Sequence, residues 1–273
     1  MKIGIAAAHY TDTRGFEDGM RQIRADGYDY IDYSEFIDTE TARFHCSDAE
    51  FDAAIRRERA IIEDAGLEIS QAHGPWRWPA QDATEEDRRE RFEKMLRAIR
   101  GTALLGCRHL VIHPLMPWGR VEADAQLAHD INLDFMTRLC RAAAKYDVVI
   151  CLENMPFRQQ SMATPEACLR FVREIDDPNF RMCLDTGHCA VHGIRPGGAV
   201  RMLGKEMLKV LHVHDNDGER DRHWYPYEGV IDWRDFGTAL REIGFDGSLS
   251  LESNVIPGRE RELYDAARRL SGR

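Results

Sequence analysis

The sequence predicts a single (β/α)8 TIM barrel that spans residues 1–273. Three observations support this prediction. Short apolar segments alternate with amphipathic helical patterns from end to end, these segments are rich in Val, Ile and Leu, and the connections are short. Apolar strands with little alternation are typical of a parallel sheet that is buried on both faces. Eight such strand–helix units in a chain of this length favour one barrel, without a linker or a second domain.

Each predicted strand is a short apolar run, and most end in polar residues. The predicted strands cover residues 2–7, 28–33, 67–73, 108–113, 148–153, 181–185, 210–214 and 248–252. Hydrophobic residues at helical spacing predict helices at about 48–65, 84–105, 123–145 and 232–243, a first helix on which Phe16, Met20 and Ile23 share a face, and a last helix that closes the chain. Thr164 and Pro165 predict the N-cap and first residue of a further helix. Residues 196–198 are interpreted as a Gly-rich loop.

Composition argues against several classes of protein. The formal net charge of -10 and the pI near 5.6 disfavour a general nucleic-acid or membrane surface. No apolar run approaches the length of a membrane span, and the apolar run at the N-terminus is too short for a signal peptide. The seven cysteines are odd in number and show no CxxC spacing, which indicates reduced, buried thiols. We therefore expect a cytoplasmic protein.

Metal-ligand side chains stand at the carboxyl ends of six predicted strands. They are His73, His113, Glu153, Asp185, His214 and Glu252. The carboxyl ends of barrel strands converge on one face, where active sites are built. The segment 211–233 adds further histidines and carboxylates, which are costly to bury unpaired but are the usual ligands of divalent cations. The sequence therefore predicts a shared metal site.

Neighbouring residues have less specific interpretations. Trp76 and Trp78 follow the third predicted strand and are expected either to stack on a substrate or to close the site against water. Glu35 ends the second strand and is expected to hydrogen-bond a ligand histidine. Asp215 and Asp217 are candidate ligands, although Asn216, Asp217 and Gly218 equally indicate a turn.

Four motifs carry a resemblance to a known family. LEN at 152–154, LDTGH at 184–188, HVHDND at 212–217 and LES at 251–253 resemble the xylose-isomerase-like TIM-barrel superfamily, in particular its sugar phosphate isomerase/epimerase group, which is related to endonuclease IV. The resemblance covers nearly the whole chain. It implies a metal-dependent isomerase or epimerase that transfers a proton through a metal-stabilised enediolate. The expected partner is a small sugar or a polyol-derived ketone.

The resemblance also implies roles for individual residues. In the ketose 3-epimerases of this superfamily, one divalent metal is held at positions that match Glu153, Asp185, His214 and Glu252. The two matching glutamates act there as acid and base. Manganese is the first expectation for the metal, with zinc, cobalt and magnesium as alternatives.

Substrate contacts follow from the same resemblance. A histidine at the place of His188 binds sugar oxygens in these epimerases. Their substrate-binding arginine falls here on an acidic position, so Arg220 and Arg222 are the nearest candidates.

Two alternatives stay open at the level of sequence. Endonuclease IV holds three zinc ions, and its ligand positions match His73, His113, Glu153, Asp185, His188, His214, Asp221, His223 and Glu252. That resemblance implies a phosphoesterase that uses a metal-activated water. The acidic net charge disfavours nucleic acid as the partner. The third hypothesis is a dehydratase or lyase that acts on a keto-sugar or keto-inositol. A homo-oligomer is compatible with all three.

Overall fold

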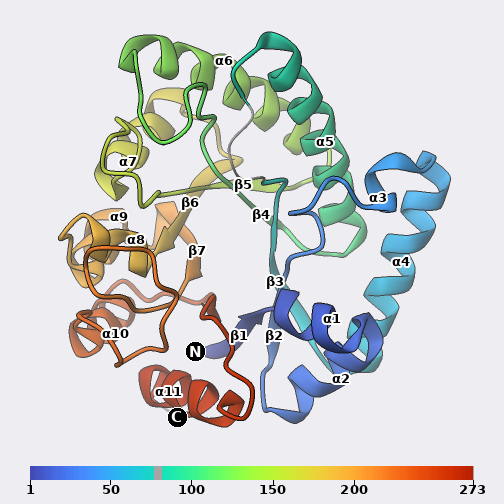
Figure 1. Cartoon of the computed structure of the whole chain (residues 1–273), viewed down its shortest axis with the longest axis vertical. Coiled ribbons are helices and arrows are strands. Elements are labelled where there is room, and N and C mark those ends of the chain that lie inside the picture. The colour runs from blue at the N-terminus through green and yellow to red at the C-terminus, as the bar shows by residue number, and fades with distance from the viewer. Residues whose placement is uncertain (77–81, 273) are drawn as a thin grey trace.

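The computed structural model describes residues 1–76 and 82–272. Its centre is one sheet of parallel strands that curls into a nearly closed barrel (Figure 1). The strands are β1 (Lys2–Ala6), β2 (Tyr30–Tyr33), β3 (Glu68–His73), β4 (His109–Ile112), β5 (Val149–Glu153), β6 (Phe180–Asp185), β7 (Leu208–His212) and β8 (Ser248–Leu251). Consecutive strands pair from β1 to β7, and β8 pairs with β1. The predicted single barrel is confirmed.

The last gap in the barrel, between β7 and β8, closes just beyond the end of β7. Val213 forms a parallel bridge with Leu251. Its N–H donates to the carbonyl of Ser250, and its carbonyl accepts from the N–H of Glu252. This pairing brings the residues that follow β7 and β8 next to each other.

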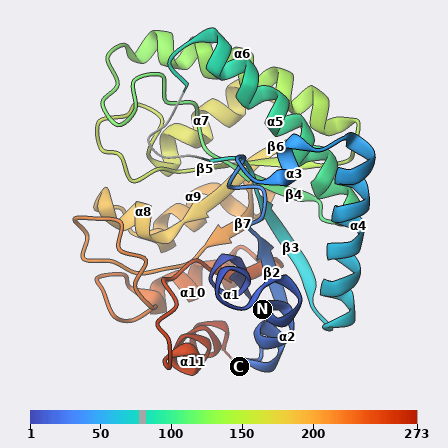
Figure 2. The same ribbon diagram turned by 45° about the vertical axis from the view of Figure 1, so that its right-hand side comes forward.

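Helices surround the strands on the outside of the barrel (Figures 1 and 2). They are α1 (Ala8–Arg14), α2 (Phe16–Ala25), α3 (Ala42–His45), α4 (Asp48–Asp64), α5 (Glu85–Leu104), α6 (Ala125–Ala144), α7 (Pro165–Ile175), α8 (Thr186–Val191), α9 (Pro196–Met207), α10 (Trp233–Glu242) and α11 (Glu260–Ser271). Side chains of Ser47, Thr84 and Thr164 accept hydrogen bonds from the first turns of α4, α5 and α7. Such caps satisfy N–H groups that have no partner within the helix. None of the helices among the described residues is long and apolar enough to cross a membrane.

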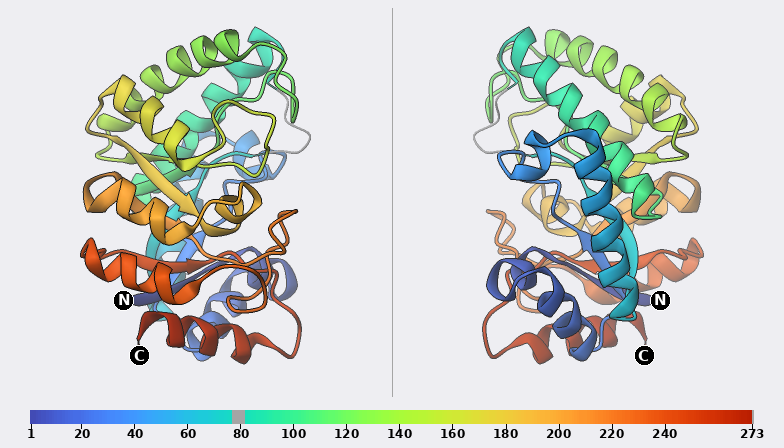
Figure 3. Two further views of the ribbon diagram at one scale, coloured as in Figure 1. Left: turned by 90° about the vertical axis from the view of Figure 1, so that its left-hand side faces the viewer. Right: turned by 90° about the vertical axis from the view of Figure 1, so that its right-hand side faces the viewer.

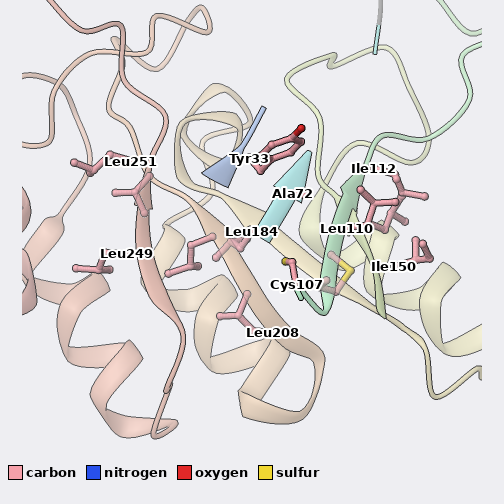
Figure 4. Close-up of a cluster of buried hydrophobic side chains, with 14 of the residues drawn as sticks. Tyr33, Ala72, Cys107, Leu110, Ile112, Ile150, Leu184, Leu208, Leu249 and Leu251 are labelled. Atoms are coloured by element: carbon pink, nitrogen blue, oxygen red, sulfur yellow. The ribbon is translucent and has the colours of Figure 1, made fainter. Parts of the chain in front are cut away.

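Alternate residues of β4, β5 and β6 pack into two different hydrophobic clusters. Leu110, Ile150, Leu184 and Leu249 belong to the main hydrophobic core (Figure 4). Their neighbours along the strands form a smaller cluster of Val111, Val149, Cys151, Cys183 and Val210. The seven cysteines are free, and six of them are buried. Apolar residues thus fill much of the barrel and leave the strand ends to polar groups.

The segment between β6 and β7 differs from the prediction. Residues 196–198 are the first turn of α9 and not a loop, because Pro is tolerated in a first helical turn and the following Ala199, Val200 and Leu203 are buried against the barrel. The short helix α8 was also missed. Strand β7 ends at His212, two residues earlier than predicted, so His214 lies in the loop that follows. This loop lies on the side of the barrel away from the N-terminus (Figure 3).

Candidate metal centre

The predicted strand-end residues form one cluster at the carboxyl end of the barrel. His73, Glu153 and Asp185 are the last residues of β3, β5 and β6. All three are buried, as are His113 and His214, whereas the side chain of Glu252 keeps 25% of its surface exposed. Glu252 is therefore accessible to solvent, unlike Glu153 and Asp185.

Glu153 connects one half of the cluster. Its Oε2 lies 3.0 Å from Nε2 of His113 and 3.8 Å from Nε2 of His73. Its Oε1 lies 2.9 Å from Nδ1 of His212, and the same nitrogen is 3.3 Å from Oε2 of Glu252. One imidazole therefore touches both glutamates.

Asp185 connects the other half. Its Oδ2 lies 2.9 Å from Nε2 of His214, and its Oδ1 accepts a hydrogen bond of 2.6 Å from the backbone N–H of His188. The second bond makes Asp185 the N-cap of α8, which fixes both residues of the LDTGH segment. Nδ1 of His188 donates to the backbone carbonyl of Asn154 at 2.7 Å and lies 3.6 Å from both Asp185 and Glu153. The ring of His188 therefore stands between the two halves.

The loop after β7 adds Asp221 and His223 to this half. Oδ2 of Asp221 lies 3.2 Å from Nε2 of His188 and 3.1 Å from Nε2 of His223. The ring of His223 stacks on that of His214 with centroids 4.0 Å apart. His223 has a φ of 52°, a left-handed conformation that is strained for a residue other than glycine and is frequent at functional sites.

The pKa values of Glu153 and Glu252 are shifted in opposite directions by their surroundings. Burial alone would raise the pKa of Glu153, but the adjacent His212 and His113 hold the pKa of Glu153 well below its usual range. Burial raises the pKa of Glu252, and His212 and His223 only partly oppose it. Glu153 therefore favours the ionised form more strongly than Glu252 does.

The pKa values of the histidines in the cluster also differ from one another. Burial lowers the pKa of His73 to about 4. Burial also disfavours the charged form of His188 and His223, but neighbouring carboxylates, among them Asp221, raise the pKa of each histidine to about 10. Burial and both histidines act on Asp221, and the histidines prevail and lower the pKa of Asp221. Asp221, His188 and His223 thus favour their charged forms, whereas His73 favours the neutral form.

The donor set fits a divalent cation. Three ligand atoms lie within 4.8 Å of one another in the group Asp185, His188 and His214. The same holds for His73, His113 and Glu153, and for His214, Asp221 and His223. Imidazole nitrogens and carboxylate oxygens are the ligands of zinc and manganese. Nδ1 of His113 and Nδ1 of His214 are buried and make no hydrogen bond to a described residue.

An open pocket of about 380 Å³ adjoins Glu252. Its walls come mainly from residues that follow β1, β2, β3 and β8: Ala6, Ala8, His9, Asp32, Ser34, Ile37, His73, His223, Glu252, Ser253, Asn254 and Val255. Among the described residues that line it there is no Lys or Arg. The walls instead offer hydroxyl, amide, imidazole and carboxylate groups, which suit a ligand with many hydroxyls.

The prediction for Glu35 is wrong, and the prediction for Trp78 concerns a residue outside the described part of the chain. Glu35 contacts no ligand histidine: it accepts a hydrogen bond of 2.8 Å from Thr11 and lies 3.6 Å from Arg43. Trp78 lies outside the described residues. Trp76 packs edge-on against His113 with ring centroids 4.3 Å apart, so it covers a candidate ligand.

Two of the polar residues after β7, Asp215 and Asp217, hold the loop together through hydrogen bonds. Asp215 is buried and accepts hydrogen bonds from the backbone of Gly229 and Ile231 and from the indole of Trp233. Asp217 accepts hydrogen bonds from the backbone N–H groups two and three residues later, as expected of a turn residue. Asp215 instead holds residues that lie 14 to 18 positions further along the chain. Nε of Arg222 donates a hydrogen bond of 2.8 Å to Oδ2 of Asp217, and Arg220 is exposed.

Sequence reasoning missed two buried residues of the site. Asp32 on β2 lies 3.0 Å from Nε2 of His212, and Gln71 on β3 donates to Asp32 at 2.9 Å. The signal that was available is a charged or amide side chain inside each of two strands, next to apolar residues such as Ile31 and Ala72. Such a side chain is costly to bury without a partner.

Comparisons with known proteins agree with this architecture. The chain is 32% identical over 189 residues to the uncharacterized protein MJ1311 of Methanocaldococcus jannaschii, a match that covers 65% of this chain and 63% of that protein. It is 24% identical over 212 residues to a D-psicose 3-epimerase of Ruminiclostridium cellulolyticum, covering 76% and 70%. The solved structure of an IolI protein with a bound zinc atom superposes with a TM-score of 0.76 at 18% identity, covering 99% of this chain and 96% of that one.

The match to MJ1311 spans less than two thirds of that protein's length, and the IolI likeness concerns the fold alone. A family model described as xylose isomerase-like TIM barrel matches residues 20–271, almost the whole chain. The chain therefore belongs to the xylose isomerase-like TIM-barrel family.

Proposed function

We propose that the protein is a divalent-metal-dependent isomerase or epimerase of a small sugar or a polyol-derived ketone. The observation that carries the proposal is the pair Glu153 and Glu252. Both carboxylates approach Nδ1 of His212, at 2.9 and 3.3 Å, and their pKa values are displaced in opposite directions. Carboxylates with separated pKa values are the arrangement that acid/base catalysis needs.

The roles of the two glutamates follow from this difference. Glu153, the more readily ionised of the two, accepts the proton from a carbon next to the substrate carbonyl. Glu252, the less readily ionised, carries the proton that is returned. His188 binds a substrate oxygen, since its ring lies between the two halves of the cluster. Return of the proton on the other face of the same carbon gives an epimer, and return to the neighbouring carbon gives an isomer.

Glu153, Asp185, His214 and Glu252 would hold the metal. When bound, a divalent cation supplies positive charge that stabilises negative charge on the substrate oxygens. Manganese is our first choice, with zinc, cobalt or magnesium as alternatives. The bound zinc in the IolI structure supports a metal in this fold.

The substrate class is supported by the pocket and by a relative. The pocket beside Glu252 offers hydroxyl, amide and imidazole groups but, among its described residues, no Lys or Arg to pair with a phosphate. The match to a D-psicose 3-epimerase points in the same direction. We therefore propose an unphosphorylated keto-sugar or a ketone derived from a polyol.

Exchange of substrate hydrogen with solvent tests the proposal. Ketoses and inositol-derived ketones are incubated with the manganese-loaded protein in D2O, and deuterium next to the carbonyl is followed by NMR. We expect exchange, and a loss of about 100-fold or more in Glu252→Gln and Glu153→Gln. Metal content measured in each variant separates lost catalysis from lost metal.

Glu228→Gln is the matched control. The carboxylate of Glu228 is bound by Arg259 at 2.6 Å, outside the cluster, so this variant is expected to keep its activity. Turnover near the wild-type level in Glu252→Gln would contradict the proposal. Formation of a dehydrated product would move the assignment to a dehydratase or lyase that uses the same glutamates.

A multi-zinc phosphoesterase is the second candidate. The observation that favours it is that His73, His113 and Glu153 form one ligand group, and His214, Asp221 and His223 form another. These are candidate positions for a second and a third metal. Elemental analysis after zinc loading, together with hydrolysis assays on phosphoesters and abasic DNA, tests it. Three zinc ions per chain with phosphoester hydrolysis would replace our first proposal.

A further inference from the structure

A carboxylate and an imidazole lie directly behind the two glutamates. Nε2 of His212 on β7 lies 3.0 Å from Oδ2 of Asp32 on β2. The other ring nitrogen, Nδ1, faces Glu153 at 2.9 Å and Glu252 at 3.3 Å. His212 has no exposed surface and Asp32 is 2% exposed. A single buried ring thus contacts three carboxylates.

The orientation of this ring is fixed from several sides. Gln71 donates from Nε2 to Oδ2 of Asp32 at 2.9 Å and to the carbonyl of Leu211 at 3.2 Å. The ring of His73 lies parallel to that of His212, with an interplanar angle of 7° and centroids 5.5 Å apart. Rotation of the imidazole would break the bonds to Asp32 and to both glutamates at once.

The chemistry of these groups makes the contact directional. Ionised carboxylates only accept hydrogen bonds, so a ring nitrogen that faces one contributes an N–H. The bond to Asp32 fixes the ring and directs Nδ1 between the two glutamates. Each glutamate keeps further lone pairs for a cation or for a substrate proton. A residue that hydrogen-bonds a reactive side chain from behind, as His212 does here, commonly fixes the orientation of that side chain.

We propose that Asp32 and His212 are a positioning pair that aims the carboxylates of Glu153 and Glu252 at the substrate. This inference rests on the acid/base role proposed above for the glutamates. The pair acts through Glu153 and Glu252 rather than on the reacting carbon. Its contribution is to reduce the freedom of two carboxylates that need a defined geometry.

Asp32→Asn is the direct test, with Glu35→Gln as its matched control. Both changes convert an acid to an amide, within β2 for Asp32 and just beyond it for Glu35. The partners of Glu35 are Thr11 and Arg43 rather than Glu153 and Glu252. We expect Asp32→Asn to lower kcat by about 10- to 100-fold with little change in KM. Glu35→Gln is expected to match the wild type in both constants.

NMR of the metal-free protein gives a readout that does not depend on activity. A buried imidazole bonded to carboxylates gives low-field N–H proton signals, which are assigned by their loss in His212→Gln. We expect both His212 signals in the wild-type protein and an upfield shift of the Nε2 signal in Asp32→Asn, because a neutral amide oxygen accepts a weaker hydrogen bond than a carboxylate does. Absence of any low-field His212 signal from the wild-type protein, which requires no variant, would overturn the proposal.

The outcomes separate the two proposals. If no ketone exchanges its hydrogen, the proposed function fails, but the manganese affinity of Asp32→Asn still tests the pair. An affinity about 10-fold or more below that of the wild type supports it, and an unchanged affinity with unchanged NMR signals contradicts it. If Asp32→Asn does not fold, Gln71→Met replaces it, since this change removes the donor that holds Asp32 and is expected to alter kcat in the same direction.

Discussion

The imidazole of His214 lies against the α-carbon of Gly187. A Cβ atom at residue 187 would fall 2.0 Å from Cε1 and 2.4 Å from Nδ1 of the His214 ring, well inside van der Waals contact. Glycine at this position of the LDTGH motif therefore leaves the space that lets His214 approach Asp185 to 2.9 Å. The glycine of the motif is explained by packing of a candidate ligand.

Gly187→Ala is expected to displace His214 and to destabilise the protein. Overpacking a filled site costs about 1–3 kcal/mol in the free energy of unfolding. Affinity for manganese should fall as well, since Asp185 and His214 would no longer converge. Thermal unfolding and calorimetric titration with manganese measure the two effects. Gly198→Ala is the control, because its Cβ would meet nothing within 4 Å and it lies in the first turn of α9. Equal manganese affinity in Gly187→Ala would exclude His214 as a ligand.

The multi-zinc candidate, in which His188 and His223 are ligands, predicts that metal affinity rises with pH. The pKa values of His188 and His223 are raised to about 10 in the metal-free protein, so a cation that binds these nitrogens must displace protons. Titrations between pH 6 and about 10 should show tighter binding at higher pH if these histidines are ligands. Asp221→Asn removes a carboxylate that raises both pKa values and should flatten the dependence. If the metal affinity of the wild-type protein does not change with pH, His188 and His223 are not metal ligands.

Stability of the metal-free protein should change in the opposite sense. A histidine whose pKa is raised on folding stabilises the folded state fully below its unfolded pKa, about 6.5, and this contribution is lost as pH rises to about 10. The pKa of Asp221 is lowered, so its contribution is present above about 4 and is lost as pH falls. We therefore expect the melting temperature of the chelated protein to fall from pH 7 toward pH 10, and also toward pH 3. Asp221→Asn should reduce the alkaline loss.

Metal removal should lower the stability at neutral pH. Glu153, Asp185 and Glu252 place three carboxylates in one cluster, and a bound cation would compensate their charge. A ligand present at 100 times its dissociation constant stabilises the folded state by about 2.7 kcal/mol. Denaturant unfolding with manganese at that ratio, compared with unfolding in EDTA, measures this difference. Identical unfolding curves would contradict a metal site in the folded protein.

Asp215 is expected to stabilise the loop after β7 without holding a metal. Asp215→Ala leaves the donors of Gly229, Ile231 and Trp233 without their acceptor, and each unsatisfied buried donor costs about 1–3 kcal/mol. We expect a loss of about 3 kcal/mol or more in the free energy of unfolding. Asp217→Ala should change stability far less, because the side chain of Asp217 is partly exposed and its partners lie in the same turn. The metal content of folded Asp215→Ala should equal that of the wild type, and a lower content would make Asp215 a ligand.

The sequence by itself determined the barrel and the set of polar strand ends. Periodicity decides which segments become strands, and parallel strands in a barrel direct their carboxyl ends to one face. This is why His73, His113, Glu153, Asp185 and Glu252 were predicted to converge, and the structure brings them together. Catalytic and metal-binding roles for these residues, the cytoplasmic location and the oligomeric state remain predictions.

Only the tertiary structure decided the partners within the cluster. His212 and Asp32 are 180 residues apart in the sequence, and no local pattern relates them. Glu35 was expected beside a ligand histidine, but it lies beyond β2 next to Thr11, whereas Asp32 lies within the strand and contacts His212. The physical reason is closure of the barrel. It places Asp32 of β2, Glu153 of β5 and Glu252, which follows β8, around the buried ring of His212 on β7. This arrangement depends on the register of the strands rather than on any single segment.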